Sequence, residues 1–375
     1  MYTVLSGAKK NIGDFLITDR CKKLLQEHRP DRQLVQLPHW EVLDNHLDQI
    51  NASKAVIIMG GPGFQLNFYP HVYKLVKNLD DIKVPIIPMG LGWKGFPGDY
   101  LTMKNYRFSN SSSNLLNRIS RETEYVSCRD YMTKRILNNN GVKNALMTGC
   151  PVWYDIESIG KDMRKPKEIK KVVFTPAQVH IYKNQSIDIL KLLKNLFPHA
   201  ELYCSFHRGI DSYDEFTPKA DITNNVTIAQ EAQKLGYKVE DVSFDLNKIN
   251  FYDECDLHIG YRVHGHIYFL SRRKPSILIH EDGRGRGVSE ALNVLGVDGF
   301  ARTSPGFIAD KYNMPIVTKA IKKSLGVIRP NGSAIDILGV YIRDEVESGF
   351  SRFAGVGKVI DSNYEIMKRF IKSLP

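Results

Sequence analysis

The stretch Leu257-His-Ile-Gly260-Tyr-Arg262-Val-His264-Gly-His266 passes from an apolar strand, through a glycine, into a helix within one short segment. Outward from it in both directions, short apolar runs bounded by glycine alternate with amphipathic stretches. Continuous apolar strands separated by helices favour a parallel sheet that is covered on both faces. The sequence therefore predicts an α/β fold of the doubly wound kind.

The alternation fills both halves of the chain. In the first half we expect strands at residues 3–6, 34–37, 55–59, 84–89, 125–128 and 145–148, and helices at 15–27, 72–79, 112–120 and 131–138. In the second half we expect strands at 171–174, 200–206, 238–242, 257–260 and 276–280, and helices at 186–196, 226–235, 263–271 and 289–295. The tail from residue 310 onward has a helical pattern. This pattern does not give the order of the strands in each sheet.

The chain is long enough for two domains. Its 375 residues exceed the usual size of one domain, and each half could bury a full core. The segment 156–170 is polar and charged and carries Pro166, which is typical of a linker. We therefore predict a Rossmann-like domain at 1–155, a linker at 156–170, and a second Rossmann-like domain with a helical tail at 171–375.

Composition and charge limit the classes of partner. Hydrophobic residues make up 42% and charged residues 25%, as in a soluble globular protein. The formal net charge of +11 suits anionic ligands. The lysines and arginines are scattered and no nucleic-acid-binding motif is present, so we expect no nucleic-acid partner. Two short basic clusters, Lys319–Lys323 and Lys368–Lys372, are interpreted as solvated helix faces, with contact to an anionic membrane as the alternative.

The sequence predicts a cytoplasmic protein. Its N-terminus lacks the apolar core and the cleavage site of a signal peptide, and no apolar run approaches the roughly 20 residues that span a bilayer. Its five cysteines are far apart and odd in number, which fits a reducing compartment. A peripheral location at the inner face of the membrane is compatible with the basic clusters.

Three glycine-rich loops follow strands of the first half. In an open α/β sheet ligands bind beyond the carboxyl ends of the strands, and exposed amides there suit anions. The alternative is tight-turn geometry without a ligand. The third loop also matches a dinucleotide fingerprint, but Pro97 and Gly98 follow where that motif requires a helix, so we expect no dinucleotide cofactor. The residues singled out in these loops are Asn11, Gly13, Asp14, Gly60, Gly61, Gly63, Gly90 and Gly92.

The strand end at Gly260 offers the clearest chemistry. A guanidinium at Arg262 can hold a carboxylate or phosphate in bidentate fashion, and an imidazole at His264 can transfer a proton. His266 is a supporting candidate, and the alternative for each histidine is an imidazole satisfied by backbone contacts. Further candidates for binding an anionic donor are Arg129, His180, His207, Arg208, Arg284 and Arg286.

A metal site is the alternative use of these histidines. The residue types that could ligate a metal are Cys255, His258, His264 and His266. Their spacing matches no structural zinc pattern, and neighbouring side chains on a strand point to opposite faces. We therefore expect no metal.

These segments, in their order along the chain, resemble the polysaccharide pyruvyl transferase family. The likeness rests on the segments 11–14, 59–63, 88–92, 126–130 and 256–264. The resemblance implies a GT-B-like fold, in which two Rossmann-like domains face a cleft, with the acceptor on the first domain and the donor on the second. It implies transfer of a pyruvyl group from phosphoenolpyruvate to a sugar of a cell-surface polysaccharide or its precursor, forming a ketal without a cofactor.

The resemblance also implies residue roles. The Arg-x-His element of the family corresponds to Arg262 and His264, and its Arg-Asp helix start corresponds to Arg129-Asp130. The chain departs from the family pattern at Tyr261, where an arginine commonly follows the glycine more directly. It departs again at His280-Glu-Asp, where the family often has a lysine. These departures concern the identity of the donor rather than the fold.

We hypothesise that Arg262, with Arg129 or an arginine of 284–286, neutralises the donor and that His264 protonates its methylene carbon. A sugar hydroxyl then adds at the neighbouring carbon, and phosphate leaves as a second hydroxyl closes the ketal. The alternatives are a GT-B-type glycosyltransferase that uses a nucleotide sugar, and a binding module without chemistry. We expect a sugar or a lipid-linked oligosaccharide as acceptor, and the sequence does not define the acceptor sugar or the oligomeric state.

Overall fold

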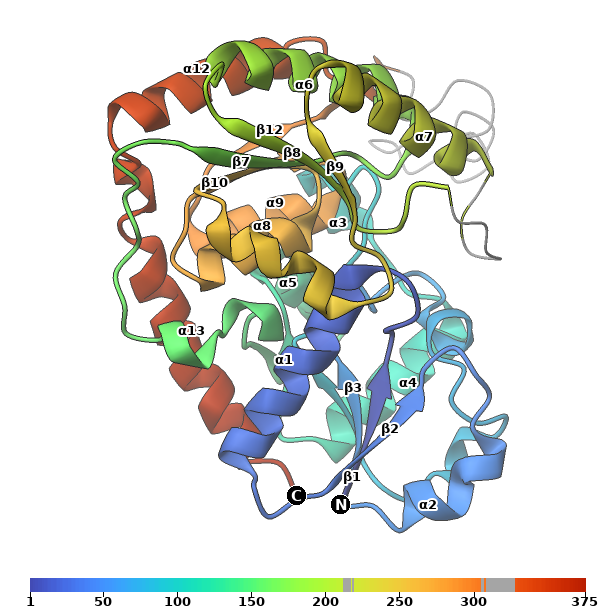
Figure 1. Cartoon of the computed structure of the whole chain (residues 1–375). Helices are drawn as coiled ribbons and strands as arrows, with labels where there is room; N and C mark the ends of the chain where they lie inside the picture. Colours follow the sequence, from blue (N-terminus) through green and yellow to red (C-terminus); the bar gives the residue numbers. More distant parts are fainter. Residues whose placement is uncertain (212–216, 218, 305–306, 308–327) are drawn as a thin grey trace. The chain divides into compact units, whose positions relative to one another are not determined.

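The computed structural model describes residues 1–211, 217, 219–304, 307 and 328–375. Contacts between residues divide the chain into two compact units (Figure 1). Unit 1 comprises Met1–Lys9, Asp14–Ile159 and Val359–Pro375, and unit 2 comprises Lys10–Gly13 and Gly160–Lys358. Each unit is an α/β structure built around parallel strands.

Unit 1 is built on short parallel strands. They are β1 (Tyr2–Ser6), β2 (Leu34–Pro38), β3 (Val56–Met59), β4 (Ile86–Met89), β5 (Val126–Cys128) and β6 (Ala145–Met147). The first four form one sheet in the order β2-β1-β3-β4, in which Val4 pairs with Ile57, and β5 pairs with β6. An isolated bridge between Leu91 and Cys128 connects the segment after β4 with β5. Since β1, β3 and β4 are buried along their whole length, their apolar side chains form the core of the unit.

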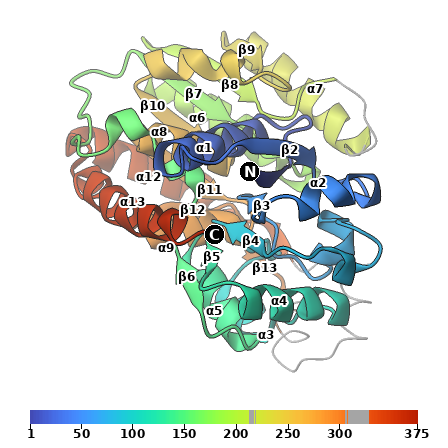
Figure 2. The same ribbon diagram turned by 90° about the horizontal axis from the view of Figure 1, so that it is seen from below.

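Helices cover both faces of this sheet. They are most of α1 (Ile12–His28), α2 (Leu47–Asn51), α3 (Tyr100–Asn105), α4 (Asn110–Glu122), α5 (Tyr131–Asn139) and most of α13 (Val356–Lys372). Figure 2 shows α1 on one face and α4 on the other. Several helices begin at a polar N-cap, because the side chains of Asp99, Ser109 and Asp130 accept hydrogen bonds from backbone amides of the first turns of α3, α4 and α5.

Unit 2 contains a larger parallel sheet. Its strands are β7 (Lys171–Thr175), β8 (Glu201–Phe206), β9 (Lys238–Asp241), β10 (Leu257–Gly260), β11 (Ser276–His280) and β12 (Gly296–Asp298). Their order is β12-β11-β10-β7-β8-β9, so successive strands run outward in both directions from the central pair β7 and β10. This is the strand order of a Rossmann fold, and the central pair is its topological switch point.

The helices among the described residues of unit 2 lie in two layers. They are α6 (Lys183–Leu196), α7 (Lys219–Lys234), α8 (Val263–Ser271), α9 (Gly283–Leu292) and α12 (Ala334–Glu347). Figure 1 shows α6, α7 and α12 on one face of the sheet and α8 and α9 on the other. An antiparallel pair, β13 (Phe300–Arg302) and β14 (Ile328–Pro330), completes the described part of the unit.

The predicted fold class is confirmed, because each unit contains a parallel sheet with helices on both faces, as two Rossmann-like doubly wound domains require. The facing of the two domains across a cleft, as in GT-B proteins, stays a prediction. The helical tail is confirmed in α12 and α13, whereas residues 310–327, which include the cluster at Lys319–Lys323, lie outside the described residues. The second basic cluster, Lys368–Lys372, forms the end of α13, and its contact with a membrane stays a prediction.

One predicted helix is wrong. Residues 72–79 form no α-helix, and Leu75 has a left-handed φ of 49°. The segment instead bonds to the chain after β2, because Lys74 N donates to His39 O (3.2 Å) and Leu43 N donates to Leu75 O (2.6 Å). A second difference concerns the polar stretch after β11, where α9 starts at Gly283 instead of the expected residue 289.

The last helix groups with the first unit, whereas the sequence analysis assigned 171–375 to the second domain. This grouping results from aromatic contacts of the last helix and from a hydrogen bond between the two ends of the chain. The ring of Tyr364 packs against His28 and Tyr154, with ring centroids 5.6 Å apart in both pairs. The hydroxyl of Tyr2 donates to the Pro375 carbonyl (2.7 Å).

Among the described residues, every helix is too short or too polar to cross a membrane. All five cysteines are buried and free of disulfides.

Candidate functional site

The switch point of unit 2 lies at the carboxyl ends of β7 and β10. The two strands are paired in parallel up to Thr175 and Gly260, and the chain then leaves them toward opposite sides of the sheet. Such a divergence opens a crevice beyond the strand ends, which is where ligands bind in doubly wound folds. A small pocket is present at this place. It is lined by Pro176, Ala177, Gln178, Phe206, His207, Arg208, Gly209, Asn225 and Arg262.

Thr175 fixes the turn that follows β10. Its carbonyl accepts the amide of Tyr261 (2.9 Å), and its hydroxyl accepts the amide of Arg262 (3.3 Å). Gly260 has a φ of 152°, and a Cβ at this position would lie 2.3 Å from the Thr175 carbonyl oxygen. Only glycine fits such an approach, so the strand end delivers Arg262 to the pocket in a fixed orientation.

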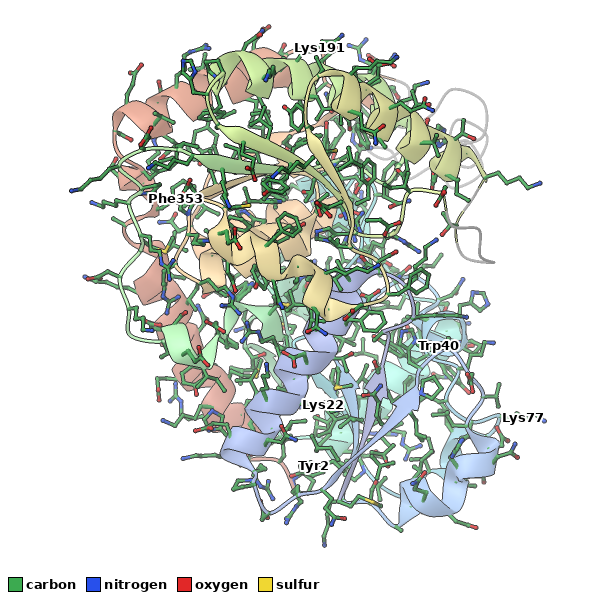
Figure 3. The ribbon with its side chains drawn as sticks, in the orientation of Figure 1. Tyr2, Lys22, Trp40, Lys77, Lys191 and Phe353 are labelled. Carbon is green, nitrogen blue, oxygen red and sulfur yellow. The ribbon has the colours of Figure 1, made fainter. Side chains whose placement is uncertain are left out.

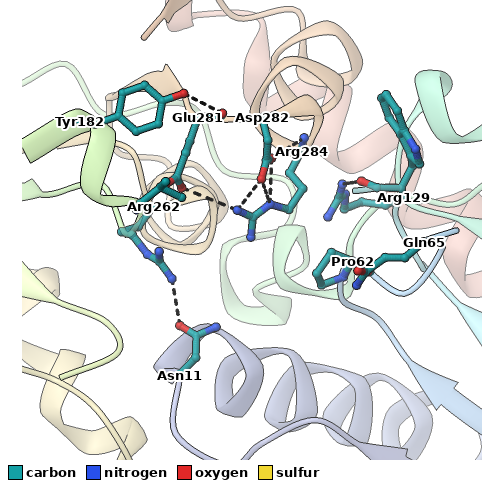
Figure 4. A network of polar contacts seen from close by, with 11 residues as sticks. Asn11, Pro62, Gln65, Arg129, Tyr182, Arg262, Glu281, Asp282 and Arg284 are labelled. Atoms are coloured by element: carbon teal, nitrogen blue, oxygen red, sulfur yellow. Dashed lines mark hydrogen bonds and ion pairs between the residues drawn. The ribbon is translucent and has the colours of Figure 1, made fainter. Parts of the chain in front are cut away.

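Arg262 is brought together with Asn11, another predicted residue. Its Nη2 donates to Asn11 Oδ1 (3.2 Å), and Figure 4 shows the guanidinium pointing toward that amide. Residues 10–13 belong to unit 2, since Ile12 N donates to the His207 carbonyl (3.0 Å) and Phe244 N donates to the Lys10 carbonyl (2.9 Å).

His264 lies in the first turn of α8 and is 8% exposed. A Cβ at Gly13 would lie 2.3 Å from its Nδ1, so the glycine at this position makes room for the imidazole. The structure therefore gathers four predicted residues, namely Asn11, Gly13, Arg262 and His264, in one place. The positive end of α8 and the guanidinium of Arg262 make this place suitable for an anion.

Beneath this site runs a buried chain of hydrogen bonds. The Thr175 hydroxyl contacts His258 Nε2 (2.9 Å), and Ser276 Oγ contacts both His258 Nδ1 (2.7 Å) and His266 Nδ1 (2.7 Å). Burial lowers the pKa of His258 to about 3, and it lowers the pKa of His266 well below its ordinary value. His266 is completely buried, so its observed contacts are those of a neutral core residue.

Of the three further candidates near β8 and α6, two line the pocket. His207 bonds to the Tyr252 hydroxyl (2.8 Å), and burial together with the positive charge of Arg262 lowers its pKa well below the ordinary value. Within the described chain, Nε of Arg208 is buried and has no hydrogen-bond partner. His180 is not in this pocket; its side chain is exposed and lies 3.7 Å from Asp221.

The two arginines after β11 are paired with carboxylates. Arg284 Nε donates to both carboxylate oxygens of Asp282 (2.8 and 2.9 Å), and Asp282 also caps α9 (Figure 4). Arg286 pairs with Asp298, which also contacts His280 Nδ1 (2.9 Å). Their role in binding the donor stays a prediction, and it would have to compete with these acidic partners.

Arg129 lies in unit 1 and is 1% exposed. Figure 4 labels Arg129, whose Nε donates to Asp130 (3.0 Å) and whose Nη2 donates to the Trp93 carbonyl (3.2 Å). A Cβ at Gly92 would lie 2.2 Å from its Cζ. Within the described ranges, its Nη1 is buried without a hydrogen-bond partner. Arg129 thus holds the loop after β4 in place through these contacts, and its contact with an anion stays a prediction.

The other glycines of unit 1 serve close packing and sharp turns. Gly60, Gly61 and Gly90 have φ values of 46°, 82° and 67°, and a Cβ at Gly63 would lie 2.2 Å from the Tyr73 hydroxyl. The loops after β3 and β4 are also bonded to each other, because Gly92 N donates to Gly61 O (2.8 Å). The turn geometry named as the alternative is therefore present, and anion binding by these loops stays a prediction.

Sequence reasoning missed Thr175 and Asn225. Thr175 ends an apolar strand that contains no other signal of function, and only the pairing of β7 with β10 brings it to Arg262. Asn225 lies on α7 and bonds to the Gly209 carbonyl (2.9 Å) beside the pocket. In the part of the chain that is described, no three His, Cys, Asp or Glu side chains come together in an arrangement that could hold a metal.

The chain thus contains two Rossmann-like units, one of which has a basic, histidine-bearing turn at its switch point, where enzymes of this fold bind their ligands. The sequence profile of the polysaccharide pyruvyl transferase family matches residues 11–282, and the chain belongs to this family. The protein is therefore a transferase of polysaccharide biosynthesis, and its family implies a sugar or oligosaccharide acceptor.

The chain is similar to several solved structures at low identity. The S. aureus protein MnaA, solved with UDP, is 13% identical, with 92% of this chain and 96% of that chain covered and a TM-score of 0.47. The UDP-GlcNAc 2-epimerase of Neisseria meningitidis, bound to UDP-GlcNAc, is 10% identical, with 98% of this chain and 100% of that chain covered and a TM-score of 0.48. Anabaena HepE in complex with UDP and glucose is 12% identical, with 94% of this chain and 98% of that chain covered and a TM-score of 0.41. At these values the likeness says nothing about ligand or activity. No curated protein sequence matches the chain.

Proposed function

We propose that this transferase moves a pyruvyl group from phosphoenolpyruvate to a pair of hydroxyls on a sugar and forms a ketal. The observation that carries the proposal is the junction of Arg262 and His264 at the switch point of unit 2. Arg208 lines the same pocket as Arg262. Two guanidinium groups suit a donor that carries both a carboxylate and a phosphate, because each can hold one anion in bidentate fashion.

His264 is proposed as the general acid. It gives its proton to the methylene carbon of phosphoenolpyruvate, which makes the neighbouring carbon electrophilic. One sugar hydroxyl forms a bond to that carbon and loses its proton, and a second hydroxyl then displaces inorganic phosphate and closes the ketal. His264 lies in the first turn of α8, two residues after Arg262, which places the proposed acid beside the proposed anion-binding group.

The test compares His264→Ala and Arg262→Ala with His199→Ala, an exposed histidine of unit 2, as the control. We expect His264→Ala to lower phosphate release by about 10²–10⁴-fold while phosphoenolpyruvate still raises its melting temperature. Arg262→Ala is expected to lose this stabilisation by phosphoenolpyruvate, and His199→Ala is expected to behave like the wild type.

The donor is tested in the same assay. Wild-type protein is incubated with phosphoenolpyruvate or with UDP-glucose and a panel of sugar acceptors, and release of phosphate and of UDP is measured separately. Release of UDP without phosphate would contradict the proposal and favour the glycosyltransferase alternative. Stabilisation by a ligand without any product would favour a binding module.

A further inference from the structure

Helix α12 carries apolar side chains on its outer face as well as on its inner face. The inner side chains, among them Leu338 and Ile342, are buried in unit 2. On the opposite side of the helix, Ile337 and Val340 are 50% and 52% exposed. A surface helix usually places polar residues toward solvent, and exposed apolar residues that adjoin one another mark interaction sites. The outer face of α12 is therefore a candidate contact surface.

A third exposed apolar residue borders this face. Leu295, in the loop before β12, is 57% exposed, and its carbonyl accepts the hydroxyl of Tyr341 from α12 (3.3 Å). Ile337 lies one turn before Tyr341 on the same side of the helix, because residues four apart are neighbours on a helix surface. The apolar surface therefore continues from the helix onto the adjoining loop.

The end of α12 is held firmly in unit 2. The amide of Phe350 donates to the Glu345 carbonyl (2.7 Å), and Phe353, which Figure 3 labels, is buried. The Glu345 carboxylate is buried as well and pairs with Arg352 (2.9 Å). The outer face of α12 is thus a preformed surface, and covering it requires little ordering of the chain.

Two opposite charges flank Val340 on this face. Asp336 precedes it by four residues and Arg343 follows it by three, so both lie on the same side of Val340, rotated from it by about 40° and 60° around the helix. Both side chains are exposed, and within the described residues neither has an ionic or hydrogen-bonding partner. The guanidinium of Arg343 lies along this side, because a Cβ at Gly339 would be 3.7 Å from its Nη1.

A second copy of the chain supplies the partners that these charges lack. When two α12 helices pack antiparallel about a two-fold axis beside Val340, each residue keeps its side of the interface and reverses its height along the helix. Asp336 of one copy then lies opposite Arg343 of the second copy, offset by only about 1.5 Å, the rise of one residue. The symmetry makes this pair twice, and the two Val340 side chains meet at the centre.

The remaining residues of this face fit the same arrangement. On the other side of the axis, Ile337 meets Asp344 of the second copy, whose carboxylate is paired with its own Arg352 (3.4 Å). Near the ends of the helices, Glu347 lies opposite Ser333 of the second copy. The antiparallel packing therefore brings no two like charges together.

We propose that the chain forms a symmetric dimer through the outer face of α12, with Asp336, Val340 and Arg343 at its centre and Leu295 at its border. Unit 2 alone supplies this surface, and the dimer is independent of the donor and the acceptor in the proposed reaction. A single helix face is smaller than the about 1,600 Å² of a standard interface, so we expect reversible dimerisation in the micromolar range.

Sedimentation velocity of the whole chain between about 1 and 100 µM tests the proposal. Val340→Asp places two carboxylates at the axis and is expected to abolish the dimer. Asp336→Arg and Arg343→Asp should each raise the dissociation constant at least about tenfold, because each variant sets two like-charged pairs against each other. The double variant exchanges the two charges and should dimerise like the wild type. Lys234→Glu, an exposed charge on α7, is the control and should leave dimerisation unchanged.

A wild type that stays monomeric up to about 100 µM would overturn the proposal. So would a dimer that persists in Val340→Asp and in both single charge reversals, because it would have to use another surface. A double variant that dimerises no better than the single reversals would contradict the antiparallel pairing. Circular dichroism checks that each variant is folded, and if Val340→Asp does not fold, the two reversals and their combination decide the question.

Discussion

Thr175 shows how much of the site depends on a single hydroxyl. It belongs to β7, yet its carbonyl and hydroxyl hold the amides of Tyr261 and Arg262 after β10. The same hydroxyl contacts His258 Nε2 (2.9 Å). One side chain therefore connects the turn that presents Arg262 with the buried histidines beneath it.

Removal of this hydroxyl should lower the free energy of unfolding more than the small size of the group suggests. Thr175→Val preserves the shape of the side chain but removes the hydroxyl that accepts the Arg262 amide and contacts His258 Nε2. Because each unsatisfied buried polar group costs about 1–3 kcal/mol, we expect a clear loss in the free energy of unfolding, measured by urea denaturation. Thr175→Ser retains the hydroxyl and should lose much less. Equal stability of the two variants would show that the hydroxyl does not hold the turn.

At the scale of elements, α5 illustrates how a helix start and a buried charge are combined. Asp130 Oδ1 accepts the amide of Thr133 (2.7 Å) and its Oδ2 accepts Arg129 Nε (3.0 Å). Asp130 is thus both the N-cap of α5 and the counter-ion of an arginine that is 1% exposed. Loss of a cap and loss of a counter-ion can be separated by substitution.

Asp130→Ala removes both functions, and we expect it to destabilise the fold by about 3–5 kcal/mol, since it leaves a buried charge uncompensated. Asp130→Asn retains an oxygen for the cap and should be less damaging by about 1 kcal/mol. Ser109→Ala at α4 is the matched control for an uncharged cap and should cost about 1 kcal/mol. Chemical denaturation checks the series, and a loss in Asp130→Ala no larger than in Ser109→Ala would be inconsistent with the counter-ion role.

Two elements of the structure differ from the helices that the sequence predicts. The segment 72–79 has an amphipathic pattern, but its backbone groups bond to the chain at His39 and Leu43 instead of to each other. The pattern records which side chains are buried and not which backbone partners are available, so it cannot distinguish these outcomes. The start of α9 was missed for a related reason, because glycines and arginines in 283–287 favour a loop until Asp282 caps the helix.

At the scale of the whole molecule, buried histidines make stability depend on pH. His207, His258 and His266 are all in unit 2, and burial lowers the pKa of each below 6.5 in the folded state. Above pH 6.5 these histidines are neutral in both the folded and the unfolded chain, so they do not change the free energy of unfolding with pH. Below pH 6.5 the histidines of the unfolded chain bind protons that those of the folded chain do not. The free energy of unfolding therefore decreases as the pH is lowered.

We therefore expect the urea midpoint to decrease between pH 7 and pH 5. Each fully buried histidine contributes a loss of at most about 2 kcal/mol at pH 5. Asp298, whose pKa is lowered by His280 and Arg286, loses its contribution only at lower pH, outside this window. Urea denaturation followed by circular dichroism at pH 7.5, 6 and 5 provides the measurement, and an unchanged midpoint would mean that these histidines titrate in the folded state.

The sequence by itself determined the doubly wound α/β class, the strands at 257–260 and 276–280, and the position of Arg262 and His264 together just after a strand end. These features are local, because they depend on the period of apolar residues and on groups a few positions apart. The tertiary structure alone decided the strand order, and with it the contacts of Thr175 with Arg262 and the carboxylate partners of Arg284 and Arg286. These features depend on contacts between residues distant in sequence, and hydrophobic periodicity contains no information about which strands become neighbours.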